Sequence, residues 1–229
     1  MISIIIPTFN EKKNINELVE RILCSMPECE IIFVDDNSPD GTSNYIIDLM
    51  KDHSCIKLIT RPEKTGLASA VTEGFKIAKY DTVCVMDADL SHPPEALPGM
   101  YKIIREEGAD IIVGSRLVKG GGSTYWPWYR QLFSLAARLV AQPLTRVKDL
   151  TSGYFMFKKQ IIEGITLNPI GFKICLEVLT KGKYDKVVEF PIVFVDRGKG
   201  KSKMGIKETL EYFKQVAQLY AANKRRNRS

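Results

Sequence analysis

ISIIIPTFNEKKNINELVERILCSMPECEIIFVDD, residues 2–36, places two short apolar runs on either side of a stretch with helical spacing. The runs at 2–7 and 30–36 are rich in Ile and Val, which is typical of parallel strands buried on both faces. Residues 11–26 carry Ile and Leu at the three- and four-residue spacing of an amphipathic helix. A strand, a helix and a second strand in this order predict a βαβ unit.

The same alternation continues toward residue 116. Further strands are expected at 55–60, 81–87 and 110–116. Helices are expected at 41–53, 65–80 and 93–108. The pattern therefore predicts an open α/β sheet with right-handed crossovers.

Polar residues follow the predicted strands. PTFNE (7–11), DDNSPDGT (35–42), TRPEKTG (60–66) and DADLS (87–91) stand at four carboxyl ends, the edge where such sheets bind ligands. The sequence has neither GxGxxG after the first strand nor GxxxxGK[ST], so it supports neither a dinucleotide fold nor a P-loop. KGGGS (119–123) lacks the flanking strand and helix of a phosphate cradle, and we expect a flexible loop there.

The composition is that of a globular protein with a positive charge. The chain has 229 residues, 45% of them hydrophobic, and 33 Lys and Arg against 27 Asp and Glu, for a net charge of +6. This balance favours an anionic partner such as phosphate, nucleic acid or an acidic membrane surface. Five scattered cysteines without a CxxC pair predict reduced thiols rather than disulfides or a zinc site. We expect no signal peptide and no membrane span, so any membrane contact should be peripheral or through a partner.

Asp87 and Asp89 are carboxylates one residue apart, directly after a predicted strand. Two such charges repel each other unless a cation lies between them, and the spacing therefore predicts a divalent metal with oxygen ligands. A solvated turn is the alternative interpretation.

Segments along nearly the whole chain resemble the family-2 glycosyltransferases with the GT-A fold. They are SIIIPTFNE, VDDNSPDGT, GLASAV, VMDADLSHPPE, VGSR and LTSGYFMFKK, in this order. WPWYR, NPIGFKICLEVL and DRGKGKSKMG make the resemblance closer to the dolichyl-phosphate mannose synthases. The resemblance implies a mixed, mainly parallel sheet flanked by helices, with one catalytic domain over 1–210. A C-terminal helix and basic tail (206–229), without a transmembrane domain, would follow.

The resemblance also assigns a nucleotide site. It implies contacts with the base and ribose from Pro7, Phe9, Glu11, Val34 and Asp36. Pro7 and Val34 would stand at strand ends whatever the function. Asp36 follows a second acid at the exit of a buried strand, where a ribose hydroxyl would give at least one of the two carboxylates a partner.

For the turn after residue 86, the resemblance implies a metal and donor site. Asp87 would lie on the nucleotide-sugar side, Asp89 would bind Mg²⁺ or Mn²⁺, and the backbone of Ala88 would face the donor. Ser91 would give a further metal contact, although Ser is short for that role. His92 is a conceivable ligand or base, but beside two prolines we expect it to shape the turn.

Cations are needed to bring two anionic substrates together. Arg116, Arg130, Arg197 and Lys203 are the candidates, and the resemblance implies phosphate contacts for the last three. Arg116 could equally form a structural ion pair. An acceptor phosphate with a second pKa near ~6 is largely a dianion, so a strong general base is not required.

The C-terminal half carries two further candidates for function. Residues 123–147 have aromatic and aliphatic side chains at helical spacing, which suits either a membrane interface or a core helix. GKGKSKMG (198–205) suits either a lid over phosphates or an exposed loop. After a helix from about Ile206, NKRRNRS (223–229) is expected to be a disordered basic tail.

The resemblance implies inverting, metal-dependent transfer of mannose from GDP-mannose to dolichyl or another polyprenyl phosphate. UDP-glucose-dependent transfer to the same kind of lipid is the nearest alternative, and a noncatalytic anion-binding module is the other. No nucleic-acid partner is expected, because the acidic strand ends would repel a polyanion. The enzyme would attach peripherally to the cytoplasmic side of the endoplasmic reticulum or of a prokaryotic cell membrane, directly or through a small anchoring partner.

Overall fold

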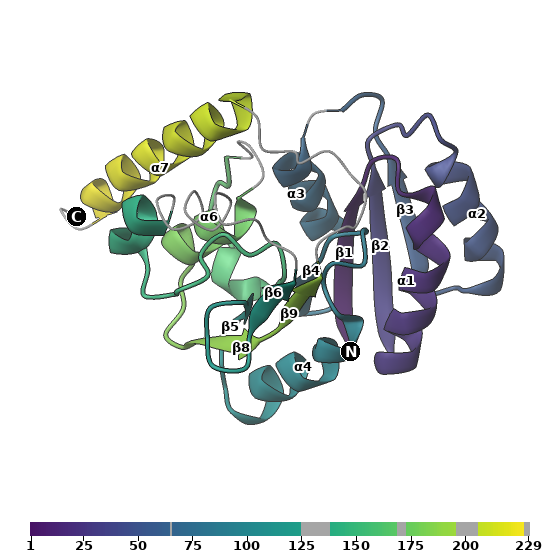
Figure 1. Cartoon of the computed structure of the whole chain (residues 1–229), viewed down its shortest axis with the longest axis horizontal. Coiled ribbons are helices and arrows are strands. Elements are labelled where there is room, and N and C mark those ends of the chain that lie inside the picture. The colour runs from purple at the N-terminus through teal and green to yellow at the C-terminus, as the bar shows by residue number, and fades with distance from the viewer. Residues whose placement is uncertain (65, 125–137, 169–172, 196–205, 227–229) are drawn as a thin grey trace.

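A seven-stranded sheet forms the centre of the computed structural model, which describes residues 1–64, 66–124, 138–168, 173–195 and 206–226 (Figure 1). Its strands are β1 (Ile2–Thr8), β2 (Cys29–Asp35), β3 (Ile56–Thr60), β4 (Thr82–Val85), β5 (Ile111–Ser115), β7 (Phe155–Lys158) and β8 (Val187–Pro191). They lie in the order β3-β2-β1-β4-β7-β5-β8.

The remaining elements cover or flank this sheet. The α-helices are α1 (Lys12–Ser25), α2 (Thr42–Asp52), α3 (Leu67–Ile77), α4 (Leu97–Glu106), α6 (Ile174–Lys181) and α7 (Ile206–Arg226). Short 3-10 helices are η1 (Pro94–Ala96), η2 (Gln142–Leu144) and η3 (Lys159–Ile162). A second, two-stranded sheet pairs β6 (Gly122–Thr124) with β9 (Val193–Val195). The glycine-rich segment that was expected to be a loop therefore ends in a strand.

The central sheet is mixed and mainly parallel, as the resemblance implied. β1 is parallel to both β2 and β4, β2 is parallel to β3, and β5 is parallel to β8. β7 is antiparallel to its neighbours β4 and β5 and separates the two parallel groups. The five strands expected from the sequence are confirmed, whereas β7, β8 and the small sheet were not expected.

Strand β1 shows why the expected strands are mainly apolar. Ile4 and Ile6 pack into the hydrophobic cluster on one face of the sheet, and Ile5 packs into the cluster on the other face. β2 repeats the alternation, with Ile31 and Phe33 on the first face. Because both faces are covered, every position of such a strand favours an apolar side chain.

Helices cover both faces of the sheet. The first cluster includes side chains of α1, α2 and α4, and the second includes side chains of α3 and α6. The α3 layer lies very close to β1 at Gly74, where a Cβ atom would stand 2.5 Å from Cγ2 of Ile5. Any larger residue at Gly74 would force the helix away from the sheet.

Helix α7 packs on the outer side of α6 (Figure 1). Tyr212, Val216 and Leu219 join Leu176 of α6 in a third hydrophobic cluster. The helix continues to Arg226, so the expectation of a disordered tail is wrong for 223–226. Within the described residues, no helix combines the length and the apolar character needed to cross a membrane.

Candidate active site

The carboxyl ends of β1, β2, β3 and β4 lie along one edge of the sheet. Thr8 pairs with Asp35, and Asp35 pairs with Thr60, so three parallel strands end at the same level. The backbone N–H of Met86, just after β4, donates to Ile5 O of β1 (3.2 Å). The polar segments after these strands therefore meet at one edge, which confirms the sequence expectation.

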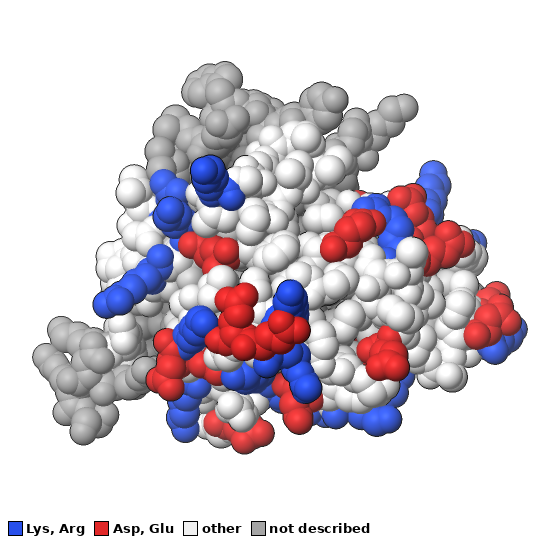
Figure 2. Space-filling model, turned by 90° about the horizontal axis from the view of Figure 1, so that it is seen from below, with Lys and Arg blue, Asp and Glu red and all other residues white. Residues whose placement is uncertain are grey.

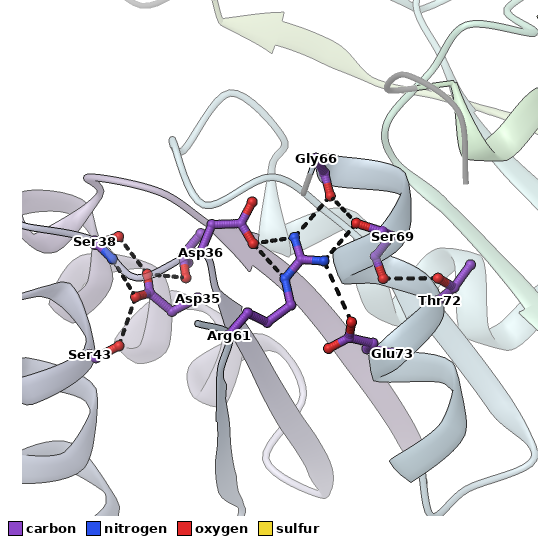
Figure 3. A network of polar contacts seen from close by, with 10 residues as sticks. Asp35, Asp36, Ser38, Ser43, Arg61, Gly66, Ser69, Thr72 and Glu73 are labelled. Carbon is purple, nitrogen blue, oxygen red and sulfur yellow. Dashed lines mark hydrogen bonds and ion pairs between the residues drawn. The ribbon is translucent and has the colours of Figure 1, made fainter. Parts of the chain in front are cut away.

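The Asp35 carboxylate is fully buried and has protein donors around it (Figure 3). It accepts hydrogen bonds from Oγ1 of Thr8 (3.0 Å), from the backbone N–H (2.9 Å) and Oγ (2.6 Å) of Ser38, and from Oγ of Ser43 (2.7 Å). Asp35 consequently needs no substrate hydroxyl to compensate its burial. Its role is to fasten the loop after β2.

The neighbouring acid, Asp36, forms a buried ion pair with Arg61 (Figure 3). Nε of Arg61 donates to Oδ1 of Asp36 (2.5 Å), and Nη2 donates to the same oxygen. Arg61 also donates to Oγ of Ser69 (2.6 Å) and to Gly66 O (3.0 Å), and Glu73 lies 3.6 Å from Nη1. Arg61 thus ties the end of β2 to the start of α3 and neutralises a carboxylate proposed to bind the nucleoside.

The other predicted nucleotide contacts lie at the same edge with different exposures. The Phe9 ring is half-buried, with Nζ of Lys64 3.8 Å from its centroid. Glu11 is buried and accepts from Nδ2 of Asn14 (2.8 Å). Pro7 is half-buried. Val34 is fully buried in the core on the α3 side, so its side chain serves packing, and only its main chain could touch a nucleotide.

The turn after β4 carries Asp87, Ala88 and Asp89. The backbone N–H and Oγ of Ser91 both donate to Oδ1 of Asp89, the former at 3.0 Å. Leu90 between them has φ of 63°, a left-handed conformation that costs energy for a branched residue and marks a constrained turn. The Asp87 side chain is 31% exposed, and Ala88 is buried in the core.

His92 holds this turn through a hydrogen bond to its backbone. Its Nδ1 accepts the backbone N–H of Asp87 (3.0 Å), and its ring stacks on Tyr154 with centroids 5.1 Å apart. Burial lowers the pKa of His92, which favours the neutral imidazole that such an acceptor requires. Gly153 leaves the necessary space, since a Cβ atom there would lie 3.1 Å from Cε1 of His92 and 3.3 Å from Oδ2 of Asp87. His92 therefore shapes the turn, as expected from its neighbouring prolines.

Arg116, at the end of β5, is held by an almost completely buried Asp149. Its Nε and Nη2 donate to the two Asp149 oxygens at 2.7 and 2.6 Å, and its backbone N–H donates at 3.0 Å. Burial alone would raise the pKa of Asp149, but the hydrogen bonds and charge of Arg116 outweigh it, and the pKa lies below its usual value. The structure thus supplies the ion pair that was one of two interpretations of Arg116.

Three of the predicted cations, Arg130, Arg197 and Lys203, lie outside the described residues. So do 125–137 of the stretch 123–147 with helical spacing and all of the segment 198–205. Among the residues that are described, no group of three or more His, Cys, Asp and Glu side chains could hold a metal ion. The donor set at the turn is therefore the two carboxylates, Asp87 and Asp89. Mg²⁺ commonly binds through one or two carboxylates together with substrate phosphates, so these two carboxylates suit a divalent metal ion.

Arg61 and Asp149 were not identified from the sequence. The signal for Arg61 is a basic residue at the same sheet edge as two adjacent acids, 35 and 36. Charges buried at such an edge require neutralisation. No comparable local signal marks Asp149, which lies 33 residues from its partner.

Comparison with known proteins gives consistent matches. The model of the family described as Glycosyl transferase family 2 matches residues 3–166. A dolichol-phosphate mannosyltransferase of Pyrococcus furiosus is 46% identical over 224 residues, covering 95% of this chain and 63% of that protein. A dolichol-phosphate mannosyltransferase of Saccharomyces cerevisiae is 37% identical over 232 residues, covering 95% of this chain and 86% of that protein.

A solved structure shares the fold. The mannosyltransferase PcManGT of Pyrobaculum calidifontis, in complex with GDP-Man and Mn²⁺, superposes with a TM-score of 0.64 at 17% identity. The match covers 97% of this chain and 68% of that one. The Pyrococcus relative is longer, and this chain spans less than two thirds of it.

Proposed function

The chain belongs to glycosyl transferase family 2, and on this premise we propose that it transfers mannose from GDP-mannose to dolichyl or another polyprenyl phosphate. The identities with two dolichol-phosphate mannosyltransferases support this choice of donor and acceptor. One geometric observation carries the proposal. The acidic end of β2 and the two-carboxylate turn after β4 flank β1 at the same sheet edge. Two strand spacings separate them by about 10 Å, a span that a nucleoside diphosphate can bridge.

At the nucleoside end, the chain's own residues would bind and orient the donor. Phe9 offers a ring face, and Asp36 offers a carboxylate that Arg61 holds in place. Pro7, Glu11 and the main chain of Val34 would complete the pocket. A site fixed in this way by its own ion pair needs little rearrangement when the donor binds.

At the diphosphate end, we propose that Asp89 holds Mg²⁺ or Mn²⁺, with Asp87 and Ser91 beside it and the Ala88 backbone toward the donor. When bound, such an ion would neutralise the charge that develops on the leaving diphosphate. Ser91 already donates to Asp89, so its first contribution is to orient that carboxylate.

The acceptor phosphate would act as the nucleophile without a protein base. Its oxygen forms the new bond to the sugar carbon from the face opposite the diphosphate, and the bond to the diphosphate oxygen breaks, which inverts the carbon. A phosphate monoester with a second pKa near ~6 carries no proton that must be removed first. This fits a His92 whose Nδ1 is occupied by the Asp87 N–H. Arg130, Arg197 and Lys203 would bring the two anions together.

We propose peripheral attachment at the cytoplasmic side of a membrane, directly or through a small anchoring partner. Leu139, Val140, Phe213 and Tyr220 are all exposed. Tyr220 Oη donates to Val140 O (2.7 Å), so the end of α7 lies beside residues 139–140. These exposed apolar side chains suit contact with a membrane interface. All five cysteines are free thiols in the structure, which agrees with a reducing compartment.

The alternatives have less support. The Pyrococcus and Saccharomyces relatives are both mannosyltransferases by name, which disfavours UDP-glucose as donor. A noncatalytic module that binds polyanions would present a continuous basic field. On the face seen in Figure 2, Lys and Arg are instead interspersed with Asp and Glu.

A donor panel tests the proposal. The protein is incubated with Mn²⁺, a polyprenyl phosphate and labelled GDP-mannose, UDP-glucose or UDP-N-acetylglucosamine, and the labelled lipid is extracted. Label should enter the lipid from GDP-mannose only. Labelling from UDP-glucose alone, or from no donor, would contradict the proposal.

A further inference from the structure

Lys173 lies beside the proposed site without any role assigned so far. It precedes α6, and its half-buried side chain reaches Thr151, whose carbonyl oxygen accepts from Nζ at 3.2 Å. The carbonyl of Lys173 itself accepts from Nε2 of Gln215 in α7 (3.3 Å). The residue is therefore fixed between the loop that follows Asp149 and the helix pair α6 and α7.

Arg116 contacts the same loop residue. Its Nη2 lies 3.4 Å from Oγ1 of Thr151, so two cationic side chains meet at one threonine. The nearby carboxylate, Asp149, binds Arg116 through three N–H groups. Two cationic side chains that meet at one loop residue can donate several N–H groups to a phosphate, with the carboxylates Asp149 and Asp87 acting on the same lysine.

The electrostatics of Lys173 agree with this arrangement. Burial is the largest influence and the charge of Arg116 is the next, and together they lower the pKa of Lys173 to about 8, although Asp149 and Asp87 act in the opposite direction. A phosphate near the ammonium group would stabilise its charged form. The loop that Lys173 contacts also reaches the two-carboxylate turn, since a Cβ atom at Gly153, two residues after Thr151, would lie 3.3 Å from Oδ2 of Asp87.

We propose that Lys173 binds the phosphate group of the lipid acceptor, next to Arg116. This inference rests on the proposed function. The donor diphosphate is assigned to the turn at Asp87 and Asp89, whereas Lys173 belongs to the α6 and α7 side of the site. That side continues into the exposed apolar residues at the end of α7 and at 139–140, which is where a lipid tail would lie.

The experiment separates the acceptor from the donor. Binding of citronellyl phosphate to protein saturated with GDP and Mn²⁺ is measured by calorimetry, and so is binding of GDP and Mn²⁺ alone. Lys173→Met should weaken citronellyl phosphate binding by about 10- to 100-fold, the effect of losing one charge-assisted hydrogen bond, and leave GDP affinity unchanged. Lys173→Arg keeps the charge and should retain most of the affinity.

Lys159→Met is the matched control. Lys159 is also half-buried and donates from Nζ to a single carbonyl, that of Ala78 (2.8 Å), but it lies after β7, away from the carboxyl edge of β4. It should change neither affinity. Thermal unfolding of each variant reports on the fold.

Two results would overturn the assignment. One is wild-type affinity of folded Lys173→Met for citronellyl phosphate. The other is a loss in GDP affinity as large as the loss for citronellyl phosphate, which would place Lys173 at the donor. The proposed function can fail separately: a wild type that binds citronellyl phosphate but transfers no mannose leaves the Lys173 comparison fully measurable.

Discussion

Replacing Arg61 by Met should lower the free energy of unfolding by about 3–5 kcal/mol, because it leaves a buried carboxylate without its counter-charge. The Asp36 side chain is only 6% exposed, and Arg61 is only 3% exposed, so water cannot replace the lost partner. The same change also removes donors from Gly66 O and from Oγ of Ser69.

The magnitude can be judged against a surface pair of the same type. Arg21 donates from Nε to Glu95 at 2.8 Å, but the two side chains are 33% and 57% exposed. Arg21→Met should therefore cost less than about 1 kcal/mol. Urea unfolding of both variants gives the comparison, and a loss of about 3–5 kcal/mol in a domain of this size should lower Tm by about 6–20 °C.

A double variant separates stability from binding. In Asp36→Leu/Arg61→Met neither charge remains, so most of the stability should return, since apolar replacements of buried pairs are often neutral. Binding of GDP should stay weak, because the proposed nucleoside contact is gone. If Arg61→Met unfolds at the same urea concentration as Arg21→Met, the argument that the pair organises this edge is refuted.

Two other perturbations test the rest of the site. Arg197→Ala and Lys203→Ala should slow mannose transfer by at least about tenfold while changing GDP affinity less; equal losses in both would make them donor contacts. His92→Asn, whose Oδ1 can accept the Asp87 N–H, should retain more Mn²⁺-dependent GDP binding than His92→Phe, which keeps only the ring; the opposite order would contradict a positioning role for Nδ1.

The parallel part of the fold was predictable because its signals are local. In β1 and β2 the interior positions other than Ser3 and Glu30 are apolar, and in α1 the buried residues Ile15, Leu18, Val19 and Ile22 follow helical spacing. β7 was not predictable in this way, since it is four residues long and enters the sheet between β4 and β5 from more than 40 residues away. Only tertiary pairing defines it. β6 and β9 have three residues each, which is too short for a sequence pattern to mark a strand, and the apolar Val193 and Val195 of β9 are exposed.

The site residues, too, were predictable only where their signal is local. The carboxylates of the turn and the strand ends stand in short motifs, and their common edge follows from parallel topology. Arg61, Asp149 and Lys173 act through partners that are distant in sequence, and no spacing rule could pair them. The expectation of a disordered tail was wrong for 223–226, because α7 continues through a basic stretch whose composition alone suggested disorder.

The most direct test of the proposed reaction is its dependence on metal at Asp89. Mannose transfer from labelled GDP-mannose to polyprenyl phosphate is measured with Mn²⁺, after chelation, and in Asp89→Asn. The Asn side chain keeps an oxygen for the hydrogen bonds from Ser91, so the turn should persist while the charge that binds metal is lost. We expect the rate of transfer to fall by at least about 100-fold both in the variant and in the chelated wild-type protein. Adding Mn²⁺ back should restore the rate of the chelated wild-type protein. Transfer at the wild-type rate by Asp89→Asn, or transfer that chelation leaves unchanged, would contradict the account.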